Sequence, residues 1–216
     1  MPDHWGNRQF DDTYFHNGKP VQYEGYATTV WFDESIGFIR ENQDAPFFVY
    51  IATNAPHLSW RAPESYIEPY LDQGMPREVA AFYAMVTAID DQVGRLRSEM
   101  DRLDLAENTI LIFMSDNGSS LGEYAQRHLG ATEYVFNADM RSFKGEVYDG
   151  GHRVPFFLSA PAELFGPPRD VADLTAHIDV LPTLLETTGA SIPHGLDGQS
   201  LLPLLRDNVS WRNRVY

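Results

Sequence analysis

An aspartate, an asparagine and a glycine stand together directly after a short apolar run. Residues 110–115 carry almost nothing polar, and Asp116, Asn117 and Gly118 follow at once. Such a run is typical of a strand buried on both faces, and ligands of open α/β sheets gather at the carboxyl ends of parallel strands. Asp116 and Asn117 offer two hard oxygen ligands of the kind that Ca²⁺ or Mg²⁺ takes. All three residues are also common turn formers, so the spacing alone leaves a plain turn open.

Two further residues could act on an anionic substrate. His57 follows Pro56 in the polar turn after a second apolar run, residues 47–52, and Lys144 lies in a long polar loop, residues 118–152. Above a hard metal ion, a lysine and a histidine can neutralise the oxygens of an oxyester or protonate its leaving oxygen. Each residue also has a simpler interpretation, because loop histidines commonly make surface hydrogen bonds and loop lysines are commonly only solvated.

These residues do not form a complete catalytic site. Ca²⁺ takes about six to eight oxygen ligands, so the two from Asp116 and Asn117 seldom hold a divalent ion alone. The chain has no cysteine, which excludes a cysteine nucleophile and thiolate metal sites within it, and no other convincing nucleophile stands out.

Composition narrows the class of protein. The 216 residues suit one sizeable domain, and the net charge of −15 argues against binding to a nucleic-acid backbone. No apolar run approaches the roughly 18 residues that span a membrane. The first residues have neither a basic nor an apolar region, so they predict no signal peptide. An anionic substrate would have to be held by local cations or a metal.

The elements that must position these residues alternate between strand and helix patterns. The apolar run 47–52 predicts a strand, and the apolar residues within 77–103 recur at steps of three and four, which predicts a helix. The strand at 110–115 completes a strand–helix–strand unit, which predicts a right-handed parallel crossover and an α/β fold. Two pairs of residues stand four apart on that helix, Arg95 with Glu99 and Arg97 with Asp101, and either is expected to form a weak ion pair on its solvated face.

The rest of the chain gives weaker patterns. Residues 1–23 read as a lead-in loop without period, and residues 26–42 as a first helix. Asp179 is expected to cap a helix over 180–188. Further along the chain we expect a strand at 154–159, a short edge strand at 170–177 and a short turn at 201–205.

Six segments resemble the sulfatase family, within the alkaline-phosphatase-like superfamily, and they occur in the order of that family. Singly each is modest, but the series is highly specific, and together the segments cover most of residues 24–205. They are residues 45–57, 88–95, 108–118, 144–155, 177–185 and 196–201.

The resemblance implies a mostly parallel sheet with helices on both faces, and Ca²⁺-dependent hydrolysis of sulfate esters by a formylglycine made from Cys or Ser. It implies that Asp116 and Asn117 are two of the metal ligands, with Ca²⁺ preferred over Mg²⁺. His57 and Lys144 would contact the sulfate group, and His57 would protonate the leaving alcohol oxygen. The substrate would be a small-molecule or glycan sulfate ester, met in a periplasmic, secreted or lysosomal setting.

Several features of the family find no match in this chain. They are its first Asp-Asp metal pair, its Cys/Ser-x-Pro-x-Arg segment and its Gly-Lys-x-His stretch; the C-terminal subdomain is also missing. We therefore expect residues 1–216 to be a partial sulfatase domain, inactive alone, whose partner would be the missing N-terminal half. Residues 1–23 would lead in, 24–205 would form the core, and 206–216 would run toward the missing subdomain.

Two alternatives remain. The chain could be a non-catalytic module on the same scaffold that binds sulfated glycans or a partner chain. It could also belong to a phosphodiesterase or phosphomonoesterase of the superfamily. Those enzymes usually place more His and Asp around two metals, so Asp116, Asn117 and Gly118, together with Lys144, favour the sulfatase pattern.

Overall fold

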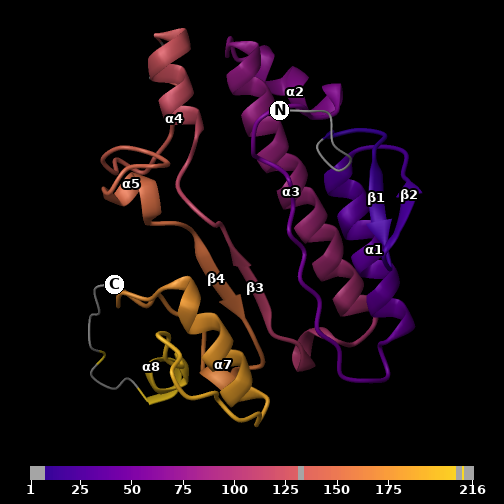
Figure 1. Cartoon of the computed structure of the whole chain (residues 1–216), viewed down its shortest axis with the longest axis vertical. Coiled ribbons are helices and arrows are strands. Elements are labelled where there is room, and N and C mark those ends of the chain that lie inside the picture. Colours follow the sequence, from indigo (N-terminus) through magenta and orange to yellow (C-terminus); the bar gives the residue numbers. More distant parts are fainter. Residues whose placement is uncertain (1–7, 131–133, 208–210, 212–216) are drawn as a thin grey trace. The chain divides into compact units, whose positions relative to one another are not determined.

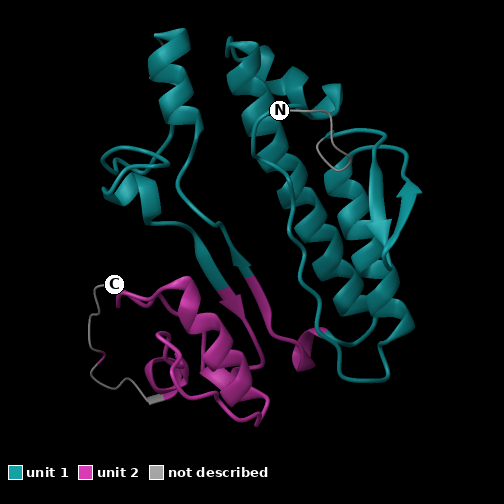
Figure 2. Ribbon diagram, in the orientation of Figure 1, with its two compact units in different colours: residues 1–105, 113–157 teal, residues 106–112, 158–216 magenta. Residues whose placement is uncertain are grey.

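The structure, a computed structural model, describes residues 8–130, 134–207 and 211 (Figure 1). The chain divides into two compact units (Figure 2), residues 1–105 with 113–157 and residues 106–112 with 158–216.

The elements, in chain order, are β1 (Thr13–His16), β2 (Lys19–Gln22), α1 (Ala27–Glu41), α2 (Glu64–Leu71), α3 (Arg77–Arg102), η1 (Ala106–Asn108), β3 (Leu111–Met114), α4 (Leu121–Tyr124), η2 (Ala125–Leu129), α5 (Asp149–His152), β4 (Phe156–Ser159), α6 (Ala162–Phe165), η3 (His177–Asp179), α7 (Val180–Thr187) and α8 (Leu202–Asp207). Among the described residues, no helix is both long and apolar enough to cross a membrane.

Helix α3 organises the first unit. It spans 26 residues and ends one residue before the predicted helix over 77–103, and it packs against both α1 and α2. Ala80, Ala84 and Met85 on α3 are fully buried in one cluster with Ile67 of α2. Small alanines on the contact face allow α2 to approach closely, so the apolar stripe of α3 serves packing, as its period predicted.

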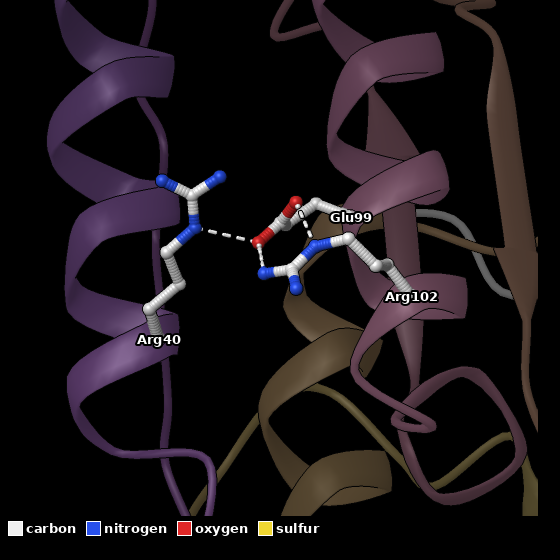
Figure 3. Close-up of polar contacts among 3 residues, drawn as sticks. All are labelled: Arg40, Glu99 and Arg102. Carbon is white, nitrogen blue, oxygen red and sulfur yellow. Dashed lines mark hydrogen bonds and ion pairs between the residues drawn. The ribbon is translucent and has the colours of Figure 1, made fainter.

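A charged cluster also joins α1 to α3 (Figure 3). The Glu99 side chain is only 11% exposed and accepts hydrogen bonds from Arg40 Nε at 2.5 Å and Arg102 Nη2 at 2.6 Å. The predicted Arg95–Glu99 pair is wrong, since Arg95 instead pairs with Asp33 of α1 at 2.7 Å. Because α1 packs against α3, Arg95 and Glu99 each pair with a residue of α1 and not with each other.

Part of the predicted lead-in loop is a β-hairpin. Strands β1 and β2 pair antiparallel, with His16 opposite Lys19. The two turn residues between them, Asn17 and Gly18, have φ of +51° and +77°. Asn-Gly is the preferred sequence of a two-residue hairpin turn, because both positions need positive φ, and it is the signal that the loop interpretation missed. Residues 1–7 of that prediction lie outside the described residues.

The described residues contain two two-stranded sheets and not the predicted, mostly parallel sheet. The predicted strand at 110–115 is β3 and the one at 154–159 is β4; the two pair with each other and run in opposite directions (Figure 1). The predicted strand at 47–52 is wrong as a ladder strand, because it is extended but pairs with nothing in the described part of the chain. Its Phe48 and Tyr50 are 74% and 75% exposed. A strand of the doubly buried type needs a neighbour on each side, and none is present here.

In the second unit, the helix predicted over 180–188 is confirmed as α7, but the edge strand predicted at 170–177 is absent. The segment runs without a strand partner into η3, and its Val171 and Leu174 are exposed. Among the described residues no strand lies beside this segment to form backbone hydrogen bonds with it, so its apolar pattern does not produce a strand. The turn predicted at 201–205 is the start of α8.

Asp179 fixes the chain around α7, although not as the predicted cap. Its carboxylate, fully buried, accepts the backbone N–H of Ala176 and of Gln199, both at 2.9 Å, and makes no cap bond to α7. Thr183 continues the network, since its hydroxyl oxygen accepts the N–H of Leu201 at 2.9 Å. The buried side chains of Asp179 and Thr183 thus tie two distant loops to one helix.

Candidate functional site

The polar turn after β3 places Asp116 and Asn117 at the end of the strand. Asp116 is exposed and Asn117 is half-buried. The turn is closed by the Ser115 hydroxyl, which donates to the Asn117 carbonyl at 3.1 Å. Among the described residues, the Asp116 carboxylate forms no ion pair. An exposed, unpaired carboxylate beside an amide is able to bind a hard cation.

Two backbone hydrogen bonds join this turn to the segment that carries Lys144. Gly118 N donates to Gly151 O at 2.9 Å, and Lys144 N donates to Ser119 O at 3.1 Å. The backbone of Lys144 is therefore held against Ser119, two positions after Asn117 in the sequence. Its ammonium group pairs with no carboxylate in the described part of the chain. The structure thus brings together the backbone segments that carry three of the four predicted site residues, Asp116, Asn117 and Lys144.

Three glycines make this close approach possible. A Cβ on Gly118 would lie 1.9 Å from the carbonyl oxygen of Gly150, and a Cβ on Gly150 would lie 1.9 Å from that of Ser142. A Cβ on Gly151 would lie 2.1 Å from the Glu146 carbonyl oxygen. The obstructing atoms are backbone, which cannot move aside cheaply. Gly150 and Gly151 belong to the predicted loop 118–152, although a Gly-Gly pair also allows close backbone contact.

His57 lies in a separate, well-anchored loop of the same unit. Its backbone N–H donates to Asn54 O at 2.9 Å, and the Trp60 indole closes the loop by donating to Pro56 O at 3.1 Å. The exposed His57 ring has its Nδ1 2.8 Å from Leu58 O. A carbonyl only accepts, so Nδ1 carries the proton and Nε2 of the neutral ring is the acceptor. No hydrogen bond or ion pair joins His57 to Asp116, Asn117 or Lys144 within the described residues.

Asp116 and Asn117 are the residues that the sequence predicts as metal ligands. Among residues 8–130, 134–207 and 211, no group of three or more His, Cys, Asp or Glu side chains gathers to hold an ion. The oxygens of Asp116 and Asn117 suit a hard cation, and further ligands would have to come from elsewhere.

Two cavities of the first unit lie beside the segments that carry Lys144 and His57. One of about 650 Å³ opens beside Ser119 and Phe143, next to the turn that holds Lys144. The other, of about 580 Å³, is lined by the residues that follow His57, including Trp60 and Arg61. Gly122 of α4 faces the first cavity and Tyr124 of α4 faces the second, so one short helix borders both. Cavities of this size are typical of small-molecule sites.

The comparison with known proteins gives the class of the chain. The family model described as Sulfatase matches residues 1–190, most of the chain, and the chain therefore belongs to the sulfatase family of the alkaline phosphatase superfamily. The resemblance drawn from the six sequence segments is thereby confirmed.

Individual relatives support the assignment. The chain is 31% identical over 211 residues to the uncharacterized sulfatase YdeN of Escherichia coli, covering 91% of this chain and 35% of that protein. It is 28% identical to an arylsulfatase of Clostridium perfringens, covering 92% of this chain and 46% of that enzyme. The chain thus spans less than half the length of these relatives.

Solved structures agree on the fold. The crystal structure of Ps i-CgsB matches with a TM-score of 0.77 and 28% identity, over 88% of this chain and 41% of that one. The structure of BT4656, with its substrate D-glucosamine-2-N,6-O-disulfate, matches with a TM-score of 0.77 at 17% identity, over 92% of this chain and 56% of that one, and so supports the fold alone. The chain therefore matches a portion of a sulfatase fold.

Proposed function

We propose that the complete protein hydrolyses a sulfate monoester and that this chain supplies part of its metal and sulfate site. The observation that carries the proposal is the pair of backbone hydrogen bonds that hold Lys144 against the turn of Asp116 and Asn117. An unpaired ammonium beside two hard oxygen ligands is suited to an oxyanion bound at a divalent cation. Membership of the sulfatase family makes the sulfate ester the preferred oxyanion.

Each residue has a distinct role in this proposal. Asp116 and Asn117 would hold Ca²⁺, which, when bound, polarises an oxygen of the ester and lowers the charge that the chain must compensate. Lys144 would neutralise a sulfate oxygen. His57 would donate a proton to the leaving alcohol oxygen, which requires the imidazolium form, because in the neutral ring the proton lies on Nδ1 facing Leu58.

A glycan is the substrate class that the relatives favour. The Ps i-CgsB structure, 28% identical, was solved with k-i-k-neocarrahexaose, an oligosaccharide. The 33% identical mouse steryl-sulfatase shows by its name that an apolar sulfate ester also occurs among the relatives. The nucleophile is expected to be a formylglycine outside this chain, so we expect the chain alone to bind a sulfate ester and not to turn it over.

The test is a calorimetric titration of the chain with 4-nitrocatechol sulfate in CaCl₂. We expect binding that Lys144→Ala weakens about tenfold, the loss of roughly 1.4 kcal/mol for one charge contact. Lys19→Ala on the exposed β1–β2 hairpin is the matched control and should leave the affinity unchanged. Equal affinity of the Lys144→Ala variant and the unmodified chain would contradict the proposal.

The calcium role is tested separately. Titration with CaCl₂ alone should show weak binding that Asp116→Ala abolishes, because two ligands are only part of a coordination shell. Asp173→Ala, an exposed carboxylate of the second unit, is the control. Tight binding that survives Asp116→Ala would place the ion elsewhere. Turnover of the ester that disappears in His57→Ala would contradict the expectation that the chain is inactive alone.

A further inference from the structure

The cavity beside the His57 loop contains a cation that no residue neutralises. Arg61 lines the 580 Å³ cavity and is exposed. Among the described residues it forms no hydrogen bond and no ion pair. The chain carries 31 acidic and 16 basic residues, yet no carboxylate pairs with Arg61 in the described part of the chain. An unpaired guanidinium in a cavity is a recognition group for a planar oxyanion.

The other arginine of the cavity is not available for this purpose. Arg77 donates to both carboxylate oxygens of Glu64, from Nη1 at 2.9 Å and from Nη2 at 2.7 Å. That bidentate pair occupies the fork of its guanidinium group and raises the pKa of Arg77. Glu78, also in the lining, adds a negative charge that would repel an anion. Arg61 is therefore the cation of this cavity that a ligand can engage.

The loop holds Arg61 in a fixed relation to His57. The Trp60 indole donates to Pro56 O at 3.1 Å, which closes the five residues from Pro56 to Trp60 into one turn. The Trp60 ring packs edge-on against Phe82 of α3 at 5.8 Å and against Tyr124 of α4 at 4.8 Å. A side chain clamped on both sides anchors the loop. Arg61 follows directly, so it shares a rigid support with His57.

The lining of the cavity combines aromatic, apolar and charged side chains. Trp60 and Tyr124 supply aromatic surface, Leu58 supplies apolar surface, and Arg61 supplies the charge. Apolar walls with a few placed polar groups are the usual lining of a ligand site. A sugar ring that carries an acidic substituent matches this combination of aromatic faces and one cation.

We propose that Arg61 pairs with a second anionic group of the substrate, a carboxylate or an additional sulfate, in the cavity lined by Trp60 and Tyr124. This inference rests on the proposed function, in which His57, at the other end of the loop that carries Arg61, contacts the sulfate ester. It adds that the preferred substrate is an acidic sugar with two charges and not a singly sulfated one. Arg61 is a specificity-determining residue and takes no part in bond breaking.

The experiment is a calorimetric titration of the chain, in CaCl₂, with galactose 6-sulfate, with galactose 2,6-disulfate and with a 6-sulfated glucosamine linked to a uronic acid. We expect the two doubly charged sugars to bind about tenfold more tightly than the monosulfate. Arg61→Gln should abolish this preference, so that the three sugars bind alike. Glu78→Gln should strengthen it. A preference for only one doubly charged sugar, lost in Arg61→Gln, supports the proposal and identifies the second group as sulfate or carboxylate.

Arg97→Gln is the matched control, because Arg97 is an exposed arginine of α3 that lines neither cavity. A preference that persists in Arg61→Gln, or that Arg97→Gln removes equally, would overturn the inference. Equal binding of all three sugars would also overturn it while leaving the proposed function intact. Lys144→Ala separates the two proposals, since it should weaken all three sugars alike. Failure of every sulfated sugar to bind would contradict both.

Discussion

At the scale of single residues, the turn that holds Asp116 depends on glycines with no room for a methyl group. Gly150 is buried, its N–H donates to Arg141 O at 2.9 Å, and a Cβ there would lie 1.9 Å from the Ser142 carbonyl oxygen. We expect Gly150→Ala to destabilise the chain by about 1–3 kcal/mol, as overpacked sites do. It should also weaken calcium and sulfate-ester binding, because the Lys144 segment would be pushed from the turn.

Urea denaturation and the two titrations measure these effects. Gly94→Ala is the control, since Gly94 lies inside α3 with open space around its Cβ position. That change should stabilise the helix by roughly 0.5–1 kcal/mol. If Gly150→Ala behaves like Gly94→Ala, the packing of the three glycines is not what positions the site.

At the scale of elements, the contact between α1 and α3 gives the stability a defined pH dependence. Hydrogen bonds from Arg102 and Arg40 hold the pKa of the Glu99 carboxyl well below its ordinary value of 4.5. A depressed pKa contributes stability that is fully present above the ordinary value and is lost as the pH falls toward the folded-state pKa. The chain should therefore lose stability below about pH 4.5, where unfolded Glu99 gains a proton and folded Glu99 does not.

The Glu99→Gln variant should be less stable than the unmodified chain at pH 7, and the difference should shrink as the pH falls from 4.5 to 2. Urea midpoints across that range measure it. Glu41→Gln, at an exposed position of α1 that forms no ion pair among the described residues, is the control and should follow the unmodified chain. A constant difference at every pH would show that the cluster acts through packing alone.

The elements also show what the sequence could and could not predict. The helix over 77–103 has a long apolar period that local sequence determines, and α3 matches it. Residues 47–52 have an equally clear strand pattern, yet the backbone stays extended with Phe48 exposed, because a strand exists only with a neighbour. Glu99 was assigned to a solvated face for a related reason, since the approach of α1 is a tertiary contact that no local period encodes.

For the site, the residue types and their positions in the sequence predicted the candidate residues, but not which of these residues lie close together. The turn of Asp116 and Asn117 was predicted because it directly follows an apolar strand. The structure shows that the segment of Lys144 is joined to this turn by backbone hydrogen bonds, one of them from Gly118 to Gly151. His57 stays on its own loop, and no hydrogen bond or ion pair joins it to the turn within the described residues. Arg61 had no sequence signal, because only the cavity around it shows that its charge is unpaired.

At the scale of the whole molecule, the division into two compact units predicts that they can lose structure separately. Asp179 is the residue to test, because it is fully buried and joins two loops of the second unit through the N–H groups of Ala176 and Gln199. Asp179→Ala leaves both donors without an acceptor, at a cost of about 1–3 kcal/mol each. Hydrogen exchange of the α7 amides should accelerate at least about tenfold, since 1.4 kcal/mol corresponds to one factor of ten.

The amides of α3, in the first unit, should keep their protection in the same sample. Asp173→Ala removes an exposed carboxylate of the second unit and should change neither helix. Because the proposed calcium and sulfate ligands all belong to the first unit, Asp179→Ala should also leave the affinity for 4-nitrocatechol sulfate unchanged. Equal acceleration in α3 and α7 would mean that the chain opens as one cooperative body, and ligand binding would then depend on the network around Asp179 as well.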